Sequence, residues 1–360
     1  MSGTERSVVL RLDGITKKFG DFAALDGISL DIHDGEFLTV VGPSGSGKTT
    51  MIRLLVGMDS PTGGDIYLKG ERVNDVPANK RPTCMVFQSL ALFPHRTVGQ
   101  NIEFPLKIRK VPPVERRARA MELIALLHLP AEYYDKNVMQ CSGGEQQRVA
   151  LARALAFDPE ILFFDEPLSA LDFRLRKMLE KELKDLHRQT GKTFVYITHS
   201  LEEAMVMSDR IAIMRVGRIE QIGTPDEIYN APTNRFVAEF MGEVNLFHVR
   251  CAPDGRLEVP EIGVSLACPE TVVADVAEAT LMVRPEVIRF LGPGEKADCV
   301  LEGTVFNEYV LGSRVQYSVR VGGKTLSVER LREDRYTGAL DTGVVIGWNA
   351  RDSRLLGPGS

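Results

Sequence analysis

The chain has 360 residues, of which 44% are hydrophobic and 26% are charged, so it can bury the cores of two or three globular domains. A formal net charge of -5 excludes the overall basic surface that is usual in nucleic-acid-binding proteins, although a local basic patch stays compatible with it. No stretch approaches the roughly 18 apolar residues that cross a bilayer, so we expect any work at a membrane to be that of a peripheral subunit.

Short runs of β-branched and aromatic residues predict buried parallel strands. The first run, FLTVV at 37–41, leads into GPSGSGKTT at 42–50 and then into a helical segment. Similar runs follow later: ILFF at 161–164, FVYIT at 194–198 and IAIM at 211–214. Helical segments separate them, which predicts an α/β fold with a parallel sheet.

The segment GPSGSGKTT matches the phosphate-loop pattern G-x-x-x-x-G-K-[ST] and lies between a predicted strand and a predicted helix. Its glycines let the loop curl with backbone N–H groups inward, and the helix N-terminus adds about half a positive charge. Lys48 can then reach the outer phosphates of a nucleotide, and the Thr49 hydroxyl can bind Mg²⁺. The residues expected to contact the nucleotide here are Gly42, Pro43, Ser44, Gly45, Ser46, Gly47, Lys48, Thr49 and Thr50.

Between the first two strands the sequence becomes charged and helical, with VERRARAMELIALLHL at 114–129 as the clearest amphipathic run. We therefore expect a helical subdomain at about 88–160 that interrupts the sheet. Within it, CSGGEQQRVALARAL at 141–155 places a serine and two glycines at a helix start, which is a second phosphate cradle. A helix terminus alone contributes only about 0.3 to 1 kcal/mol toward an exposed anion, too little to hold a nucleotide.

Two acids and a histidine follow predicted strands. In ILFFDEP, Asp165 and Glu166 directly follow the predicted strand ILFF, at the sheet edge where ligands of α/β proteins bind. Alone, such a pair is more typical of a solvated turn; beside a phosphate loop it predicts Asp165 as an Mg²⁺ ligand and Glu166 as the base that orients or deprotonates water. His199 ends the next strand. Alone it is more typical of a capping or core histidine, but its position makes it a candidate contact of the γ-phosphate.

The next helix and the C-terminal third have their own patterns. RLRKMLEKELKDLHRQTG at 174–191 predicts an amphipathic helix that ends at Gly191. Its expected buried face comprises Leu175, Met178, Leu179, Leu183 and Leu186. From about residue 243 the chain consists of short alternating segments with glycines, such as GSRVQYSVRVGGKTLSVERL at 312–331. These segments predict a separate all-β domain, a small barrel.

The cysteines are few and widely spaced, and no C-x-x-C pair occurs among them. This argues against a disulfide framework and against a zinc site, and it favours a reducing, cytosolic environment. The N-terminal segment MSGTERSVVLRLDG shows no apolar core of a secretory signal, which agrees with that expectation. The five residues are Cys84, Cys141, Cys251, Cys268 and Cys299.

The phosphate loop, CSGGEQQR, DEP, SALD and THS follow one another in an order that resembles the ATP-binding subunits of ABC transporters, and the resemblance covers nearly the whole chain. It implies a P-loop ATPase domain at 1–242 and an OB-like (TOBE) β-domain at 243–360. It also implies ATP and Mg²⁺ as cofactors and a head-to-tail homodimer. In such a dimer Ser142, Gly143 and Gly144 of one chain close on the ATP held by the phosphate loop of the other.

Further roles come from this resemblance. Phe19 would stack on adenine, although a phenylalanine there is also typical of a strand-end core residue. Gln88 would meet both the metal and the water, and Asp172 in SALD would shape the opposite site across the dimer. The segment SLALFPHRTVGQNI at 89–102 resembles the surface that grips the membrane subunits, although an ordinary loop with exposed aromatic residues fits it too.

Two positions depart from the family pattern. Cys141 stands where leucine is common, and Glu145 stands where glutamine is common. Because the serine and both glycines are retained, we expect phosphate capture to survive. An acid this close to the helix N-terminus is expected to weaken the dimer slightly, and Cys141 is expected to act as a small buried hydrophobic residue.

The C-terminal part resembles one class of importers. SDRIAIMRVGRIEQIGTPDEIYNAPTNRFVAEFMGEVNLF at 208–247, VRPEVI at 283–288 and YVLGSRVQYSV at 309–319 are similar to importer ATPases with a TOBE domain, above all those for spermidine and putrescine. Importers of sugar, iron(III), phosphonate and sulfate share this layout. The resemblance implies an ATPase that powers solute uptake with two membrane permease subunits and a solute-binding protein, at the cytoplasmic face of the cell membrane.

Two alternatives concern other functions. Soluble ABC ATPases outside transport usually carry two cassettes, zinc modules or long coiled coils, whereas this sequence has one phosphate loop and none of the others. Barrels of the OB type can bind oligonucleotides or sugars, but no basic groove interleaved with aromatic residues is evident. We therefore expect the β-domain to stabilise the dimer or to regulate it, and we expect no nucleic-acid partner.

Overall fold

The computed structural model describes residues 6–169, 171–252, 256–268 and 278–356. The chain forms two compact units, Met1–Pro225 and Asp226–Ser360. Each unit has its own sheets and its own hydrophobic core. None of the helices in the described ranges combines the length and the apolar composition that a bilayer crossing requires.

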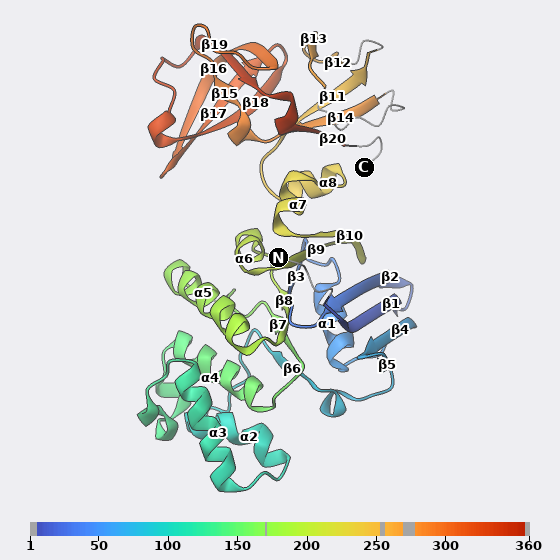
Figure 1. Ribbon diagram of the computed structural model, residues 1–360, viewed down its shortest axis with the longest axis vertical. Helices are drawn as coiled ribbons and strands as arrows, with labels where there is room; N and C mark the ends of the chain where they lie inside the picture. The colour runs from blue at the N-terminus through green and yellow to red at the C-terminus, as the bar shows by residue number, and fades with distance from the viewer. Residues whose placement is uncertain (1–5, 170, 253–255, 269–277, 357–360) are drawn as a thin grey trace. The chain divides into compact units, whose positions relative to one another are not determined.

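The centre of the first unit is a six-stranded sheet with the order β10-β9-β3-β8-β7-β6 (Figure 1). Strands β9, β3, β8, β7 and β6 run parallel, and β10 pairs antiparallel with β9 at one edge. This confirms the predicted parallel sheet. The strands are β3 (Phe37–Val41), β6 (Thr83–Val86), β7 (Ile161–Asp165), β8 (Thr193–Ile197), β9 (Arg210–Arg215) and β10 (Arg218–Gly223).

A second sheet, which the sequence analysis did not predict, is antiparallel and has the order β2-β1-β4-β5. Strands β1 and β2 form a long hairpin in which Phe19 lies opposite Phe22. Helix α1 (Lys48–Val56) buries Met51, Ile52 and Leu55 in one core with both sheets. The strands are β1 (Val8–Phe19), β2 (Phe22–His33), β4 (Gly63–Leu68) and β5 (Glu71–Arg72).

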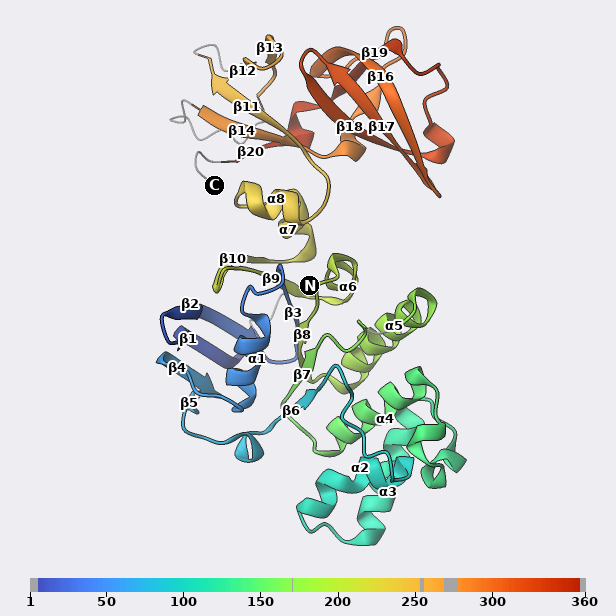
Figure 2. The same cartoon turned by 180° about the vertical axis from the view of Figure 1, so that it is seen from behind.

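Helices fill the interval between β6 and β7, where the sequence analysis expects a helical subdomain. Figures 1 and 2 both show α2 (Val98–Ile108), α3 (Pro113–Leu126) and α4 (Gly143–Ala156) gathered together. Helices α3 and α4 each pack against α2, and all three share a core with α5 (Phe173–Thr190). The short 3₁₀ helices are η1 (Ala78–Lys80), η2 (Ala131–Asp135) and η3 (Val138–Gln140).

Helix α5 ends at Gly191, which has a left-handed φ of 62° as a helix C-cap requires. Its core-facing stripe contains Leu179, Leu183 and Leu186. Met178 was predicted to lie on this stripe, and that prediction is wrong, because 44% of Met178 is exposed. The buried stripe is narrower than the sequence pattern suggests, and Met178 lies on its solvent side. Helix α6 (Leu201–Met207) follows after β8.

Both sheets of the second unit are antiparallel, which confirms the all-β domain predicted for the C-terminal part. Two five-stranded sheets, β13-β12-β11-β14-β20 and β15-β19-β16-β17-β18, share one core that includes Phe247 and Trp348. The strands of the first are β11 (Asn245–Cys251), β12 (Leu257–Val259), β13 (Val264–Leu266), β14 (Glu278–Val283) and β20 (Ser353–Leu356). Those of the second are β15 (Arg289–Phe290), β16 (Cys299–Leu311), β17 (Arg314–Val321), β18 (Lys324–Leu331) and β19 (Thr342–Trp348).

The two units divide after Pro225, whereas the sequence analysis placed the domain boundary after residue 242. Helices α7 (Pro225–Asn230) and α8 (Arg235–Phe240) account for the difference. The buried Arg284 of the β-domain donates hydrogen bonds to the carbonyl oxygens of Tyr229 and Ala238, at 3.0 and 3.1 Å. These contacts tie both helices to the β-domain, although their periodicity resembles that of the preceding α/β segment.

Candidate functional site

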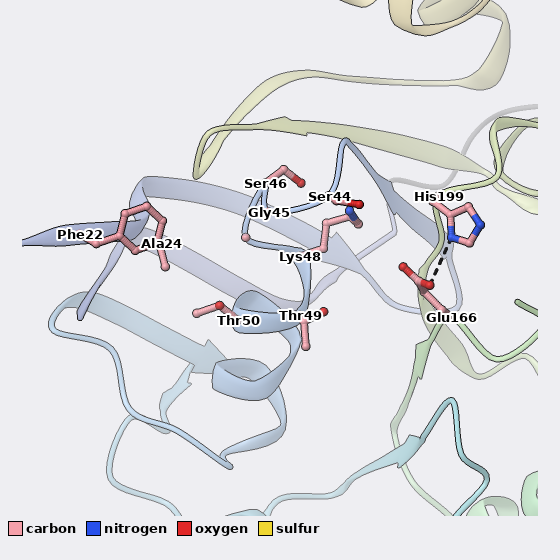
Figure 3. Close-up of a pocket in the computed structure, with 11 residues that line it drawn as sticks. Phe22, Ala24, Ser44, Gly45, Ser46, Lys48, Thr49, Thr50, Glu166 and His199 are labelled. Carbon is pink, nitrogen blue, oxygen red and sulfur yellow. Dashed lines mark hydrogen bonds and ion pairs between the residues drawn. The ribbon is translucent and has the colours of Figure 1, made fainter. Parts of the chain in front are cut away.

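A cavity of about 640 Å³ opens at the N-terminal end of α1 (Figure 3). Its volume falls within the range of roughly 300 to 1,000 Å³ that is typical of small-molecule sites. The lining comes from the phosphate loop, from β2 and from the ends of β7 and β8. The lining residues are Phe22, Ala24, Ser44, Gly45, Ser46, Gly47, Lys48, Thr49, Thr50, Glu166 and His199.

The backbone of the phosphate loop lies too close to its neighbours for side chains at two glycines. A Cβ on Gly42 would lie 2.2 Å from the carbonyl oxygen of Met214 in β9, and one on Gly47 would lie 2.6 Å from that of Ala24 in β2. Gly47 also has a left-handed φ of 101°. Only glycine is compatible with such contacts, so strands β2 and β9 fix the curvature of the loop.

Two side chains make this cradle suitable for phosphate. The Lys48 ammonium is buried and donates hydrogen bonds to the carbonyl oxygens of Gly42 and Pro43, at 2.8 and 3.0 Å. Burial lowers the pKa of Lys48, while the charges of Glu166 and Asp165 act in the opposite direction. The hydroxyl of Ser46 is buried and has no hydrogen-bond partner in the described part of the chain, so it is available to donate to a phosphate oxygen.

Glu166 and His199 point toward one another at the cavity (Figure 3). The Nδ1 atom of His199 lies 3.2 Å from Oε2 of Glu166. The backbone of Glu166 has a φ of 46°, unusual for a residue with a side chain, and its N–H donates to the carbonyl oxygen of Ile197 in β8 at 3.0 Å. The end of β8 therefore holds both residues, and strain of this kind is common at active sites.

Asp165 precedes Glu166 at the end of β7 and is partly buried. Burial raises the pKa of its carboxyl group, and the neighbouring charge of Glu166 raises it further, while Lys48 lowers it. Asp165 is not among the residues that line the cavity, whereas Thr49 is. A carboxylate and a hydroxyl are oxygen ligands of the kind that Mg²⁺ prefers, so the donor set fits this ion.

Gln88 is exposed and lies outside the cavity lining. Its Nε2 atom donates to Oγ of Ser169 at 2.9 Å, and that hydroxyl donates to the carbonyl oxygen of Glu166 at 2.9 Å. Two hydrogen bonds thus connect Gln88 with the backbone of Glu166. Sequence reasoning missed Ser169, because the contact joins positions 81 residues apart.

Phe22 lines the cavity, whereas Phe19 lies outside the lining. The two face each other across the β1–β2 hairpin. Lys17 Nζ lies 5.1 Å from the centroid of the Phe19 ring. Ala24, on the same strand as Phe22, also lines the cavity. A signal was present in the sequence: FGDF places a Gly-Asp turn between the two rings, which is typical of a hairpin.

The segment SGGE caps helix α4. Ser142 is the N-cap, its Oγ accepts a hydrogen bond from the N–H of Glu145, and Oε2 of Glu145 accepts one from the N–H of Ser142 at 2.8 Å. This last contact lowers the pKa of Glu145, and the Tyr133 hydroxyl contributes through a hydrogen bond to the carboxylate at 3.1 Å. Cys141 is buried in the surrounding core. The acid is therefore turned back onto its own helix terminus.

This second cradle stands apart from the cavity of its own chain. Ser142, Gly143 and Gly144 are not among the lining residues, and neither is Asp172. A Cβ on Gly144 would lie 2.9 Å from Cδ1 of Leu175, so α4 packs closely against α5 at this point. Asp172 is the N-cap of α5 and accepts a hydrogen bond from the N–H of Leu175 at 3.0 Å; the neighbouring Ala170 lies outside the described residues.

A phosphate loop between a strand and a helix, facing an acid and a histidine at the ends of neighbouring parallel strands, defines a P-loop nucleotide-binding domain. Residues 25–169 match the family described as ABC transporter, and residues 281–356 match the TOBE domain.

Curated relatives agree with this. The chain is 42% identical to the spermidine/putrescine import ATP-binding protein PotA of Rubrobacter xylanophilus, over 98% of this chain and 94% of that protein. It is 45% identical to the protein of the same name from Roseobacter denitrificans, over 87% of each. A solved dimeric ATP-binding cassette in a post-hydrolysis state, bound to ADP and Pi, is 35% identical with a TM-score of 0.53, over 60% of this chain and 98% of that one.

The chain therefore belongs to the ATP-binding proteins of ABC transporters that carry a C-terminal TOBE domain. It binds ATP and is an ATP-hydrolysing transport ATPase, as the resemblance in the sequence implies.

Proposed function

We propose that the chain powers the import of spermidine and putrescine, as a homodimer on the cytoplasmic face of the membrane, with two permease subunits and a solute-binding protein. The cargo rests on the relatives named for spermidine/putrescine import, which this chain matches over 94% and 87% of their lengths. The alternative is an importer of sugar, iron(III), phosphonate or sulfate. Its ATPase subunit would have the same features, because this subunit hydrolyses ATP and does not contact the transported solute.

The observation that supports the hydrolytic role most strongly is the contact of Glu166 with His199 beside the phosphate loop. Glu166 accepts the proton of the attacking water, while His199 orients Glu166 and contacts the γ-phosphate. Lys48 and the loop N–H groups stabilise the negative charge on the outer phosphates. Adenine stacks on Phe22 of the β1–β2 hairpin, which lines the cavity, rather than on Phe19, which does not.

Mg²⁺, when bound, neutralises charge on the transferring phosphoryl group. Thr49, Asp165 and Gln88 are the residues that would hold it. Gln88 is connected through Ser169 with the backbone carbonyl of Glu166, and this contact supports a role beside the catalytic acid in orienting the water.

Two phosphate cradles in one chain suit a dimer in which each ATP is held between two subunits. Ser142, Gly143 and Gly144 lie outside the lining of their own cavity, which supports a role toward the partner's ATP. ATP then joins the two subunits, and loss of the γ-phosphate releases them. Asp172 completes the opposite site, and the TOBE domain stabilises or regulates this dimer.

The test is to purify the intact complex from membranes and to measure its ATPase activity with candidate solute-binding proteins, each with and without its solute. We expect a binding protein loaded with spermidine or putrescine to stimulate hydrolysis. Stimulation only by a binding protein loaded with sugar, iron(III), phosphonate or sulfate would reassign the cargo. ATP turnover that no membrane subunit or binding protein affects would support a soluble ATPase instead.

A further inference from the structure

A buried carboxylate on α6 is part of a hydrogen-bond network that includes both neighbours of His199. Glu203 is only 3% exposed, and its Oε2 atom accepts hydrogen bonds from the Thr198 hydroxyl at 2.7 Å and from the Tyr196 hydroxyl at 2.9 Å. The Thr198 hydroxyl in turn accepts the N–H of Ser200 at 3.0 Å, and the Ser200 hydroxyl accepts the N–H of Glu203 at 3.2 Å. Thr198 and Ser200 flank His199, so the Glu203 side chain holds one of these residues directly and the other through the Thr198 hydroxyl.

An arginine on α5 connects this carboxylate with the turn that carries Asp172. Arg176 Nε lies 3.9 Å from Oε1 of Glu203, an ion pair without a direct hydrogen bond. The other end of the guanidinium donates from Nη2 to the carbonyl oxygen of Leu171 at 2.9 Å. One turn of helix separates Arg176 from Asp172, whose carbonyl oxygen accepts the Arg176 N–H at 2.9 Å. The guanidinium therefore lies between the Leu171–Asp172 turn and helix α6, which are distant in the sequence.

Packing alone does not explain why an ion pair is buried between Arg176 and Glu203. A buried ion pair is seldom more stabilising than apolar residues of the same volume, so its presence calls for another reason. Arg176 Nε is buried and has no hydrogen-bond partner among the described residues, although Glu203 lies only slightly too far away. A small movement of the Leu171–Asp172 turn would make or lengthen this contact, because the same guanidinium holds the turn.

We propose that Arg176 and Glu203 are positioning residues that set His199 against Glu166 and couple its position to the Asp172 turn. The inference rests on the roles proposed above for His199 and for Asp172 at the dimer interface. When the partner subunit displaces the turn, Arg176 shifts relative to Glu203, and Glu203 shifts the Thr198–Ser200 segment. Hydrolysis then depends on the state of the interface through a path that lies within one chain.

The first test uses the full-length protein with Glu203→Gln and, separately, Arg176→Met. Glu202→Gln is the matched control, because Glu202 is adjacent, its side chain is 64% exposed, and its ion pair is with Lys177. We expect kcat to fall about 10- to 100-fold in both variants, as displacement of a catalytic group does. KM and nucleotide affinity should change by less than about twofold, as should every parameter of the control.

The second test separates positioning from a structural role. Each substitution is combined with His199→Ala, and hydrolysis is measured under single-turnover conditions. If the pair acts through His199, adding Glu203→Gln or Arg176→Met to His199→Ala lowers the hydrolysis rate no further. If the pair only stabilises the fold, the rate reductions of the two single variants multiply in the double variant. Multiplying losses would overturn the proposal. If Glu203→Gln does not fold, Arg176→Lys serves instead, because it keeps the positive charge but has only one nitrogen, which cannot contact both Glu203 and the carbonyl oxygen of Leu171.

The third readout needs no hydrolysis. The proton NMR signal of the His199 ring is assigned by its absence from the spectrum of His199→Ala. Its chemical shift is then followed in the other variants. It should shift in Glu203→Gln and in Arg176→Met, and it should stay in place in Glu202→Gln. An unshifted signal contradicts the positioning role. Wild-type hydrolysis by His199→Ala would instead overturn the function proposed for His199, and this readout would still decide whether the pair positions its ring.

Discussion

The Nδ1 atom of His199 lies 3.2 Å from Oε2 of Glu166, at the ends of the adjacent parallel strands β8 and β7. This contact places a carboxylate and an imidazole together at the cavity that the phosphate loop lines. The histidine can hold the acid in one orientation, and the acid remains only partly buried, with 28% of its side chain exposed. A water at the cavity could therefore reach it.

The first prediction concerns this acid. Glu166→Gln keeps the shape of the side chain and its contact with His199, but the amide cannot accept a proton. We expect ATP affinity to be retained, hydrolysis to fall about 10²- to 10⁴-fold, and a nucleotide-loaded dimer to accumulate. Phosphate release and size-exclusion chromatography with light scattering measure these effects. Hydrolysis at the wild-type rate would remove Glu166 from its assigned role.

The second prediction distinguishes the two phenylalanines of the β1–β2 hairpin. Stacking of a base on an aromatic ring is worth about 1 to 3 kcal/mol, and only Phe22 lines the cavity. Phe22→Ala should weaken ATP binding by about this amount, while Phe19→Ala should change it little. Calorimetric titration with ATP gives both values. The opposite ranking would show that Phe19 is the stacking residue, as the sequence resemblance implies.

The third prediction concerns the curvature of the phosphate loop. Gly42→Ala would place a Cβ 2.2 Å from the backbone oxygen of Met214, which cannot move without distorting β9. We expect the variant to lose ATP binding and to melt at a lower temperature. Gly63→Ala is the control, because its Cβ would meet its nearest neighbour, Thr16, at an ordinary 3.8 Å. Normal ATP affinity in Gly42→Ala would mean that the loop tolerates a different curvature.

The fourth prediction concerns the acid in the second cradle. In Glu145→Gln the capping box can persist through the amide oxygen, but the charge that favours the helix N-terminus is lost, which costs about 0.3 to 1 kcal/mol of stability. In a Glu166→Gln background the same change should strengthen the ATP-dependent dimer, because it removes a negative charge from the surface that meets the partner's phosphates. Light scattering gives the dimer dissociation constant of the Glu166→Gln protein with and without Glu145→Gln. An unchanged constant would contradict this effect.

The fifth prediction follows from His187 on α5. Its ring lies 5.3 Å from that of Phe37 and 5.1 Å from that of Phe194, and burial lowers its pKa below the ordinary value of 6.5. The unfolded chain therefore binds a proton first as the pH falls. Stability is fully present above 6.5 and is lost progressively as the pH falls below that value toward the folded-state pKa.

This loss can be measured by urea denaturation at about pH 8 and about pH 5.5. His187→Leu removes the titrating group, so its free energy of unfolding should fall less between the two conditions than that of the wild type. An equal fall in both proteins would show that other groups account for the acid sensitivity.

Much of the α/β framework could be predicted, because strands buried on both faces are continuously apolar. FLTVV and FVYIT are such runs. The phosphate loop follows the first and His199 follows the second, and the sheet brings these two functional segments together. The all-β character of the C-terminal unit was equally visible, since alternation with glycines at segment ends has no helical interpretation.

The parts that could not be predicted depend on contacts between distant segments. The FGDF turn indicates a hairpin with Phe22 on its second strand, but only the fold brings that strand to the phosphate loop. Met178 fits the helical period but falls outside the stripe that α5 buries. Ser169 and Glu203 are ordinary polar residues in the sequence, and only the fold places Ser169 beside Gln88 and Glu203 beside Thr198, the residue that precedes His199.

The most direct measurement is the structure of the Glu166→Gln protein trapped with Mg²⁺ and ATP. The proposed function requires each γ-phosphate to contact Lys48 of one subunit and Ser142 of the other, so that two nucleotides lie in the interface between two chains. A trapped assembly in which Ser142 is remote from both nucleotides, or in which each chain closes its own cavity, would contradict it.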